Sequence, residues 1–271
     1  MRWRDSAKLL VGGLLMWGIL GSRAPNALSY DAMVEAVPSL LLYWKLDETT
    51  GTAAHNSSAG GSAYDGGYLG TFTLDAPPIV RGTSGCLELA GTGGGGGSSI
   101  PPGSGMVGSN SLIGPAVTRA NNFTMSAWVE IAAYSTVDAY AICGSQQYFT
   151  GAAGGPVLNI NGTGHLELDA AFTALISTST VVVPLNQKCF VAVTVDAANL
   201  CTFYINGAPA GAATVSTASL IPYGGFFVGA SKSQESFNDL NKFFGGLVSR
   251  VATFGAALSA QELAAQYLAG R

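Results

Sequence analysis

The stretch LCTFYINGAPAGAATV, residues 200–215, carries the clearest local signal in the chain. Asn206 and Gly207 stand at its centre, between two runs that suit β-strands. Both residue types tolerate the positive φ that a type I′ turn requires. The stretch therefore predicts a β-hairpin closed by a two-residue turn.

Short strand patterns of the same kind recur along the rest of the chain, each bounded by Gly, Pro, Asn, Asp or Ser. About a dozen such strands, with no helical period between them, indicate an all-β fold, a two-sheet antiparallel jelly-roll sandwich. Trp44 and Trp128 are expected inside it. One short helix is expected near the C-terminus, where Ser259 and Glu262 have the spacing of a capping box.

The composition narrows the class of partner. Charged residues make up 10% of the 271, the net charge is −4, and 37 residues are glycine. No basic cluster is present, so a nucleic-acid partner is not expected. A surface with so little charge suits a subunit whose neighbours protect it from aggregation, and a homo-oligomer is expected.

The four cysteines do not form a C-x-x-C pair, which argues against zinc binding and dithiol redox chemistry. If Val195 lies opposite Leu200, then Cys201 faces Thr194 and does not reach Cys189. All four are therefore expected to be free and mostly buried: Cys86, Cys143, Cys189 and Cys201.

Residues 1–38 form a segment of different character. A basic start precedes an apolar run from Leu9 to Leu20, which is too short to span a bilayer. Three interpretations stay open: an arm that docks on a partner, a helix packed on its own domain, and an uncleaved secretory signal. The docking arm is favoured, with residues 39–271 as the jelly-roll domain. The expected anchors are Leu9, Leu10, Leu14, Leu15, Trp17 and Ile19.

An ordered set of motifs resembles the LamG-like, or concanavalin A-like, jelly roll of phage virion and bacterial surface proteins. The resemblance covers residues 40–270. Its pieces are LLYWKLDETTGTAAHNSSAGG (41–61), GCLELAG (85–91), FTMSAWVE (123–130), FVAVTVDAANLCTFYINGAPAG (190–211) and FFGGLVSRVATFGAALSAQELAAQYLAG (243–270).

Some members of this family bind calcium, and the resemblance raises the same question here. An acidic pair that is common in the closing strand is replaced by Ser249 and Arg250. Calcium usually takes carboxylates among six to eight oxygen ligands, so these replacements argue against a site. The remaining candidates are Asp47, Asn56 and Asp65, whose roles as turn and strand-end residues are favoured. No other cofactor is expected.

The same superfamily includes endoglucanases whose motif resembles Glu-x-Asp-x-x-Glu. The stretch HLELDAAF places Glu167 and Asp169 on one face of a strand, but Phe172 stands where the closing acid belongs. Retaining hydrolysis needs two carboxylates with separated pKa values. Glu167 and Asp169 are therefore interpreted as solvent-facing strand residues, and the chain is not expected to be an enzyme.

Glycan binding is the alternative to catalysis, because exposed aromatic rings stack on sugars. Aromatic residues in or near predicted loops are the candidates: Tyr134, Tyr140, Tyr148, Phe149 and Tyr223.

The favoured hypothesis is a non-catalytic structural or adhesion protein of a phage virion. Its jelly roll would be anchored to other virion or surface-assembly subunits through residues 1–38, and would bind host glycans weakly. The alternative is a secreted bacterial lectin-like module with a signal peptide.

Overall fold

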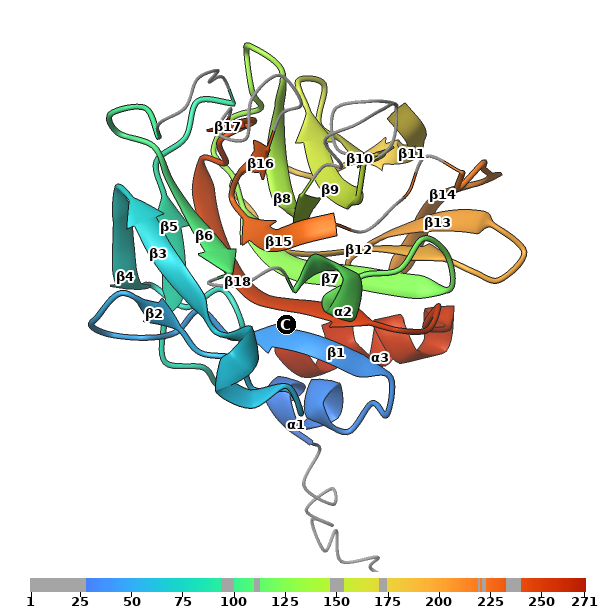
Figure 1. Cartoon of the computed structure of the whole chain (residues 1–271), viewed down its shortest axis with the longest axis horizontal. Helices are drawn as coiled ribbons and strands as arrows, with labels where there is room; N and C mark the ends of the chain where they lie inside the picture. The colour runs from blue at the N-terminus through green and yellow to red at the C-terminus, as the bar shows by residue number, and fades with distance from the viewer. Residues whose placement is uncertain are drawn as a thin grey trace, which may run out of the picture.

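Two antiparallel eight-stranded sheets stack face to face in the computed structural model (Figure 1). The structure describes residues 28–93, 100–109, 113–146, 154–170, 175–218, 220, 223–232 and 240–271. This arrangement confirms the predicted jelly-roll sandwich. The two sheets are called sheet A and sheet B below.

Sheet A contains the hairpin that opened the sequence analysis. Its strands in spatial order are β14 (Ala208–Thr214), β13 (Leu200–Ile205), β12 (Cys189–Val195), β7 (Phe123–Glu130), β18 (Gly246–Phe254), β5 (Cys86–Leu89) and β4 (Phe72–Ala76). The eighth strand, β1 (Leu40–Trp44), also pairs with β18.

Sheet B lies on the other side of the core. Its order is β11 (Leu175–Val182), β10 (His165–Ala170), β9 (Pro156–Asn161), β8 (Ala139–Gln146), β15 (Tyr223–Val228), β6 (Gly105–Ser109), β3 (Gly66–Gly70) and β2 (Ala53–Ala54). A two-stranded ribbon of β16 (Ser231–Lys232) and β17 (Leu240–Asn241) lies next to β8.

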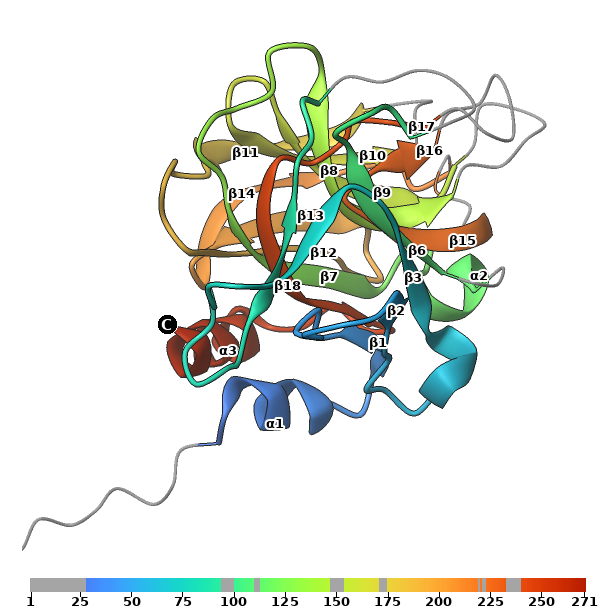
Figure 2. The same ribbon diagram turned by 90° about the vertical axis from the view of Figure 1, so that its left-hand side faces the viewer.

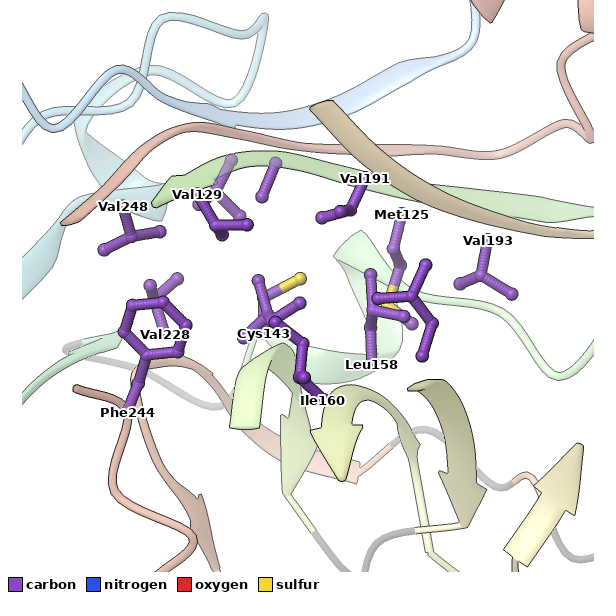
Figure 3. Packing of buried hydrophobic residues seen from close by; sticks show 14 of the residues in the cluster. Met125, Val129, Cys143, Leu158, Ile160, Val191, Val193, Val228, Phe244 and Val248 are labelled. Atoms are coloured by element: carbon purple, nitrogen blue, oxygen red, sulfur yellow. The ribbon is translucent and has the colours of Figure 1, made fainter. Parts of the chain in front are cut away.

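The space between the sheets is filled by alternate side chains of both (Figure 3). Met125 and Val191 point inward from sheet A, and Leu158 and Ile160 point inward from sheet B. Trp44 belongs to this cluster and is fully buried, as predicted. Burial of each such side chain contributes about 1.5–3 kcal/mol to folding, so this core holds the two sheets together.

A second apolar layer covers the outer face of sheet A. Helices α1 (Tyr30–Glu35) and α3 (Ala260–Gly270) pack there side by side (Figure 2). Tyr30 of α1 and Leu263 of α3 join Trp128 and Phe190 of the sheet in one buried cluster. Two shorter helical segments, η1 (Gly61–Tyr64) and α2 (Gly114–Val117), lie in connections.

The Asn206–Gly207 hairpin is confirmed, and its turn also supports α3. Asn206 has φ +53° and Gly207 has φ +75°, as a type I′ turn requires. A Cβ at Gly207 would lie only 2.9 Å from Cα of Ala264. The glycine therefore serves both the turn and the close approach of the helix. The predicted capping box of α3, between Ser259 and Glu262, is also present.

The register of the β12–β13 pair differs from the prediction by one residue. Val195 lies opposite Cys201, and Leu200 pairs with Asp196 in the connecting turn. The Asp196 carboxylate causes the shift, because its Oδ1 accepts from both Ala198 N and Leu200 N at 2.8 Å. Asp196, and not Val195, is thus the residue opposite Leu200.

All four cysteines are free and buried, as expected. Burial raises the pKa of Cys143 and of Cys201 to about 12. These thiols stay protonated at neutral pH, where a reactive cysteine would be a thiolate.

Helix α1 lies within the segment assigned to the arm, yet it packs on the sandwich. Tyr30 and Val34 are each at most 1% exposed. Residues on the N-terminal side of the expected boundary between residues 38 and 39 thus contact sheet A, and the boundary itself stays a prediction. The anchor residues between Leu9 and Ile19 lie outside the described residues, and their role stays a prediction.

The Arg250 side chain connects α1 to two segments of sheet A. Its side chain is 1% exposed and sits where β18 shifts register, at φ +53°. The guanidinium contacts Asp31 of α1 through Nε at 3.1 Å and Asp47 through Nη2 at 2.8 Å. The same group donates to the backbone oxygens of Lys45 and Gly85. One side chain thus joins α1, the end of β1 and the start of β5.

The first prediction concerns this cation. Replacing Arg250 with Met is expected to lower the free energy of unfolding by about 3–5 kcal/mol, because Asp31 and Asp47 lose their counter-charge. Urea unfolding followed by circular dichroism measures the change. Arg119→Gln is the control, since the Arg119 guanidinium donates only to the carbonyls around α2. An equal effect of the two substitutions would contradict the role given to Arg250.

Candidate functional site

The outer face of sheet B carries a row of polar side chains on β9 and β10. Leu158, Ile160, Leu166 and Leu168 point into the core. Because side chains alternate along a strand, their neighbours face outward. The outward set is Asn159, Asn161, His165, Glu167 and Asp169, and it is called the β9–β10 face below.

A buried ion pair stands at one end of the β9–β10 face. The Asp169 carboxylate accepts from Lys242 Nζ and from Asn159 Nδ2, each at 2.7 Å. The side chains of Asp169 and Lys242 are each 9% exposed. Lys242 follows β17, and its backbone oxygen accepts from Ala141 N of β8. The ribbon next to β8 therefore delivers the lysine to the sheet (Figure 1).

A second, more open pair follows at the other end. Glu167 Oε1 accepts from Asn161 Nδ2 at 2.8 Å. Oδ1 of Asn161 accepts in turn from the backbone N–H groups of Thr163 and His165. The turn between β9 and β10 thus fixes the amide, and the amide fixes Glu167.

One oxygen of each carboxylate accepts no hydrogen bond from the described residues, on the half-buried Glu167 and the buried Asp169 alike. Oε2 of Glu167 and Oδ1 of Asp169 accept no hydrogen bond from the part of the chain that the structure describes. The two residues lie on the same face of β10, two positions apart. The face therefore presents two oriented acceptors beside fixed amides, an arrangement suited to hydroxyl groups.

Burial governs the ionisation of both acids. It raises the pKa of Glu167 above its ordinary value, and the charge of Asp169 adds to the rise. Burial also raises the pKa of Asp169, and the Lys242 ammonium counteracts only part of this effect. Asp169 is therefore no solvent-facing strand residue, contrary to the sequence-based interpretation.

Tyr134 holds the turn that orients Glu167. Its hydroxyl donates to the backbone oxygen of Val183 at 2.7 Å. Its ring lies against Gly164, where φ is +88° and an added Cβ would be 2.4 Å from the ring. The tyrosine proposed as a sugar platform is thus half-buried, with its hydroxyl engaged in supporting the β9–β10 face.

The other aromatic candidates are distributed differently. Tyr140 is 7% exposed and packs edge-on against Phe244 in the core, so its ring is not presented for stacking. Tyr148 and Phe149 lie outside the described residues. Tyr223 begins β15, and its side chain is outside the described part. None of the aromatic candidates is therefore established as a sugar contact.

Comparison with known proteins agrees with this architecture. The sequence profile of the concanavalin A-like lectin/glucanases superfamily, in its laminin G form, matches residues 104–264, more than half of the chain. The chain belongs to this superfamily. A search of curated proteins finds no match.

Solved structures of low sequence identity share the fold. A structure from work on botulinum neurotoxin type C, whose cell entry depends on interaction with two ganglioside molecules, has a TM-score of 0.57 at 16% identity. It covers 85% of this chain and 51% of its own. Trypanosoma rangeli sialidase with the inhibitor DANA has a TM-score of 0.52 at 14% identity, covering 84% of this chain and 32% of its own.

A binding domain of botulinum neurotoxin DC in complex with rat synaptotagmin II is a third similar structure. Its TM-score is 0.57 at 13% identity, with 85% of this chain and 51% of that chain covered. This chain spans between about a third and half of these three proteins. The superfamily fold therefore occurs in both enzymes and non-enzymatic binding domains.

Each calcium candidate of the superfamily resemblance already has a partner within the protein. Asp47 is bound to Arg250. Asp65 accepts from Asn56 N at 2.7 Å and lies 3.1 Å from His55 Nδ1. Oδ1 of Asn56 accepts hydrogen bonds from the backbone N–H groups of Tyr43 and Ser58. Within the described residues no three His, Cys, Asp or Glu side chains are grouped to hold a metal ion.

The sequence analysis missed the three residues that hold the two carboxylates in place, which are Lys242, Asn159 and Asn161. Lys242 lies 73 residues after Asp169, and no spacing rule joins them. Asn159 and Asn161 did carry a signal, since they alternate with Leu158 and Ile160 on a predicted strand. Polar residues at alternate positions beside Glu167 and Asp169 indicate a solvated sheet face.

The second prediction tests the buried pair. Lys242→Met is expected to destabilise the fold by about 3–5 kcal/mol at neutral pH, because Asp169 is left buried without its cation. In the double variant with Asp169→Leu most of the stability is expected to return, since neither charge remains.

The pH dependence of that variant has a definite sign. Without Lys242 the folded-state pKa of Asp169 rises further above the unfolded value of about 3.9. The folded protein then binds more protons than the unfolded chain, so the defect is largest above the folded-state pKa and shrinks as the pH falls. Urea unfolding at about pH 7 and at about pH 4 measures this loss of stability. A defect that stays constant over this range would contradict the pairing.

Proposed function

We propose that this chain is a non-catalytic, lectin-like adhesion domain that binds glycans on the β9–β10 face. The observation that carries the proposal is that the carboxylates of Glu167 and Asp169 lie on one face of β10 and that each has one oxygen without a hydrogen bond from the described residues. Lys242 and the amides of Asn159 and Asn161 hold both groups in place. Sugar hydroxyls donate to such acceptors, and a pre-oriented acceptor lowers the entropy lost on binding.

The roles already taken by the two carboxylates favour binding over hydrolysis. Asp169 neutralises Lys242, and Glu167 is tied to Asn161. Glucanases of this superfamily have a motif that resembles Glu-x-Asp-x-x-Glu, and this chain has Phe172 in place of the last glutamate. Two carboxylates on one strand without that acid give no separate nucleophile and proton donor.

The similar structures support glycan binding by analogy of fold alone. One similar structure concerns a neurotoxin whose cell entry depends on ganglioside molecules, and another is a sialidase with an inhibitor. A third is a binding domain in complex with a protein partner, rat synaptotagmin II. Glycans are proposed here because the β9–β10 face is polar and charged, whereas a protein interface is usually depleted of charge at its centre.

The setting we propose is a phage virion, in which the chain serves as a decoration, fibre or tail component. The support is compositional: 10% charged residues, 37 glycines and the apolar run from Leu9 to Leu20. Other virion subunits, bound through the N-terminal segment, and further copies of the chain would be its partners. A secreted bacterial lectin-like module is the second candidate, favoured by the basic start before that apolar run.

The third prediction tests the site. On a glycan array, the glycans retained by the protein are expected to bind at least about tenfold more weakly to Glu167→Gln, since a hydrogen bond to a charged group contributes about 1.5–3 kcal/mol. Glu88→Gln is the matched control, because Glu88 is an exposed carboxylate on β5 of the other sheet. Neither the protein nor Glu167→Gln is expected to release reducing ends from β-glucans. Turnover that Glu167→Gln abolishes would refute the non-catalytic assignment.

The fourth prediction tests the setting. A chain that starts at residue 28 keeps Tyr30, Asp31 and Val34 and is expected to retain the thermal transition and glycan binding of the full chain. The same chain is expected to lose incorporation into particles. Mixing experiments with particles that lack the protein measure incorporation. If the shortened chain incorporates as well as the full one, the anchor lies elsewhere.

A further inference from the structure

A cavity of about 360 Å³ lies on the opposite side of the molecule from the β9–β10 face. It is formed where the segment between β4 and β5 passes the end of α3 (Figure 2). Arg81 N donates to Gly270 O at 2.7 Å and fixes the two segments together. Cavities of this size hold small ligands in other proteins.

The cations around this cavity lack acidic partners. Among the described Lys and Arg side chains, Lys45, Lys242 and Arg250 form ion pairs with carboxylates. The described cations that form none are Arg81, Arg119, Lys188 and Arg271. Three of these four line the cavity, and no Asp or Glu lines it. The ionisable side chains that line the cavity are therefore all cationic.

The rest of the wall is apolar and aromatic. Ile79 and Val80 are each 2% exposed, and the rings of Trp128 and Tyr267 stack at 5.9 Å with an interplanar angle of 24°. The Cε2–Cζ2 edge of Trp128 faces Gly270, where an added Cβ would lie 2.6 Å from Cζ2. The end of α3 and the indole thus close one side of the cavity without a gap.

We infer that this cavity binds an acidic sugar, whose carboxylate meets Arg81, Lys188 and Arg271 and whose ring lies on the apolar wall. Charge-assisted hydrogen bonds from such cations to a carboxylate are about twice as strong as neutral ones. The hydroxyls of a neutral sugar accept weaker hydrogen bonds from the same cations. The site is separate from the β9–β10 face, and the inference does not depend on the proposed function.

Stabilisation of α3 is the competing explanation for the positive charge. Cations near a helix C-terminus offset its dipole. Lys188 distinguishes the two explanations, because it precedes β12 and its ammonium donates to Pro78 O at 2.9 Å. Lys188 is therefore no cap of α3, and because its hydrogen bond to Pro78 O is exposed, a substitution there is expected to lower the stability only slightly.

The experiment compares two matched probes on the full chain. Methyl β-D-glucuronide and methyl β-D-glucoside have the same ring and differ only in the carboxylate. Tryptophan fluorescence and saturation-transfer NMR measure their affinities, and acetate tests the carboxylate without a ring. The glucuronide is expected to bind at least about tenfold more tightly than the glucoside or acetate.

The variants locate the site. Lys188→Glu is expected to weaken glucuronide binding at least about tenfold with only a small change in the thermal transition, and Lys188→Arg is expected to keep binding. Arg119→Gln, which removes a cation that does not line the cavity, is expected to have no effect on this ligand. Equal affinity for the two glycosides, affinity for acetate equal to that for the glucuronide, or full binding by Lys188→Glu would each overturn the inference.

Discussion

The buried guanidinium of Arg250 is the interaction on which the arrangement of the helical layer depends. A charge that is 1% exposed needs counter-charges, and Asp31 and Asp47 supply them from two different segments. Burial alone would raise the pKa of Asp31, but hydrogen bonds from Arg250 and Tyr43, together with the charges of Arg250 and Lys45, lower it. Because the folded-state value is depressed, this stabilisation is present above the unfolded value of about 3.9 and is lost as the pH falls through the lower one.

The same cation engages one of the three calcium candidates of the resemblance. The closing strand has Arg250 where the family often has an acid, and the arginine takes up Asp47. A guanidinium satisfies this carboxylate with fixed geometry, whereas a calcium ion would need several more oxygens. The exchange of an acid for an arginine thus converts a candidate ion ligand into part of an internal salt bridge. The consequence is structural, since α1 is held on the sheet by the same group.

Local signals of the sequence predicted local structure well. Asn206–Gly207, the capping box at Ser259 and the burial of Trp128 all follow from the residues within a few positions. The β12–β13 register did not, because the Asp196 side chain reorganised the turn. The packing of α1 was also missed, since it rests on Arg250, 219 residues after Asp31. The Asp169–Lys242 pair was not predicted for the same reason, because only the fold brings β10 close to the end of β17.

The two outer faces of the sandwich have different chemistry, and this difference places the candidate sites. On sheet A the outward side chains include Trp128, Phe190 and Phe254, which must be covered, and α1 and α3 cover them. Sheet B directs Asn161, Glu167 and Asp169 outward from β9 and β10, and such side chains need no apolar cover. The site proposed on sheet B therefore uses the strands themselves, where positions are rigid. The site inferred on sheet A lies at the margin of the helical layer, where Arg81, Lys188 and Arg271 line a cavity.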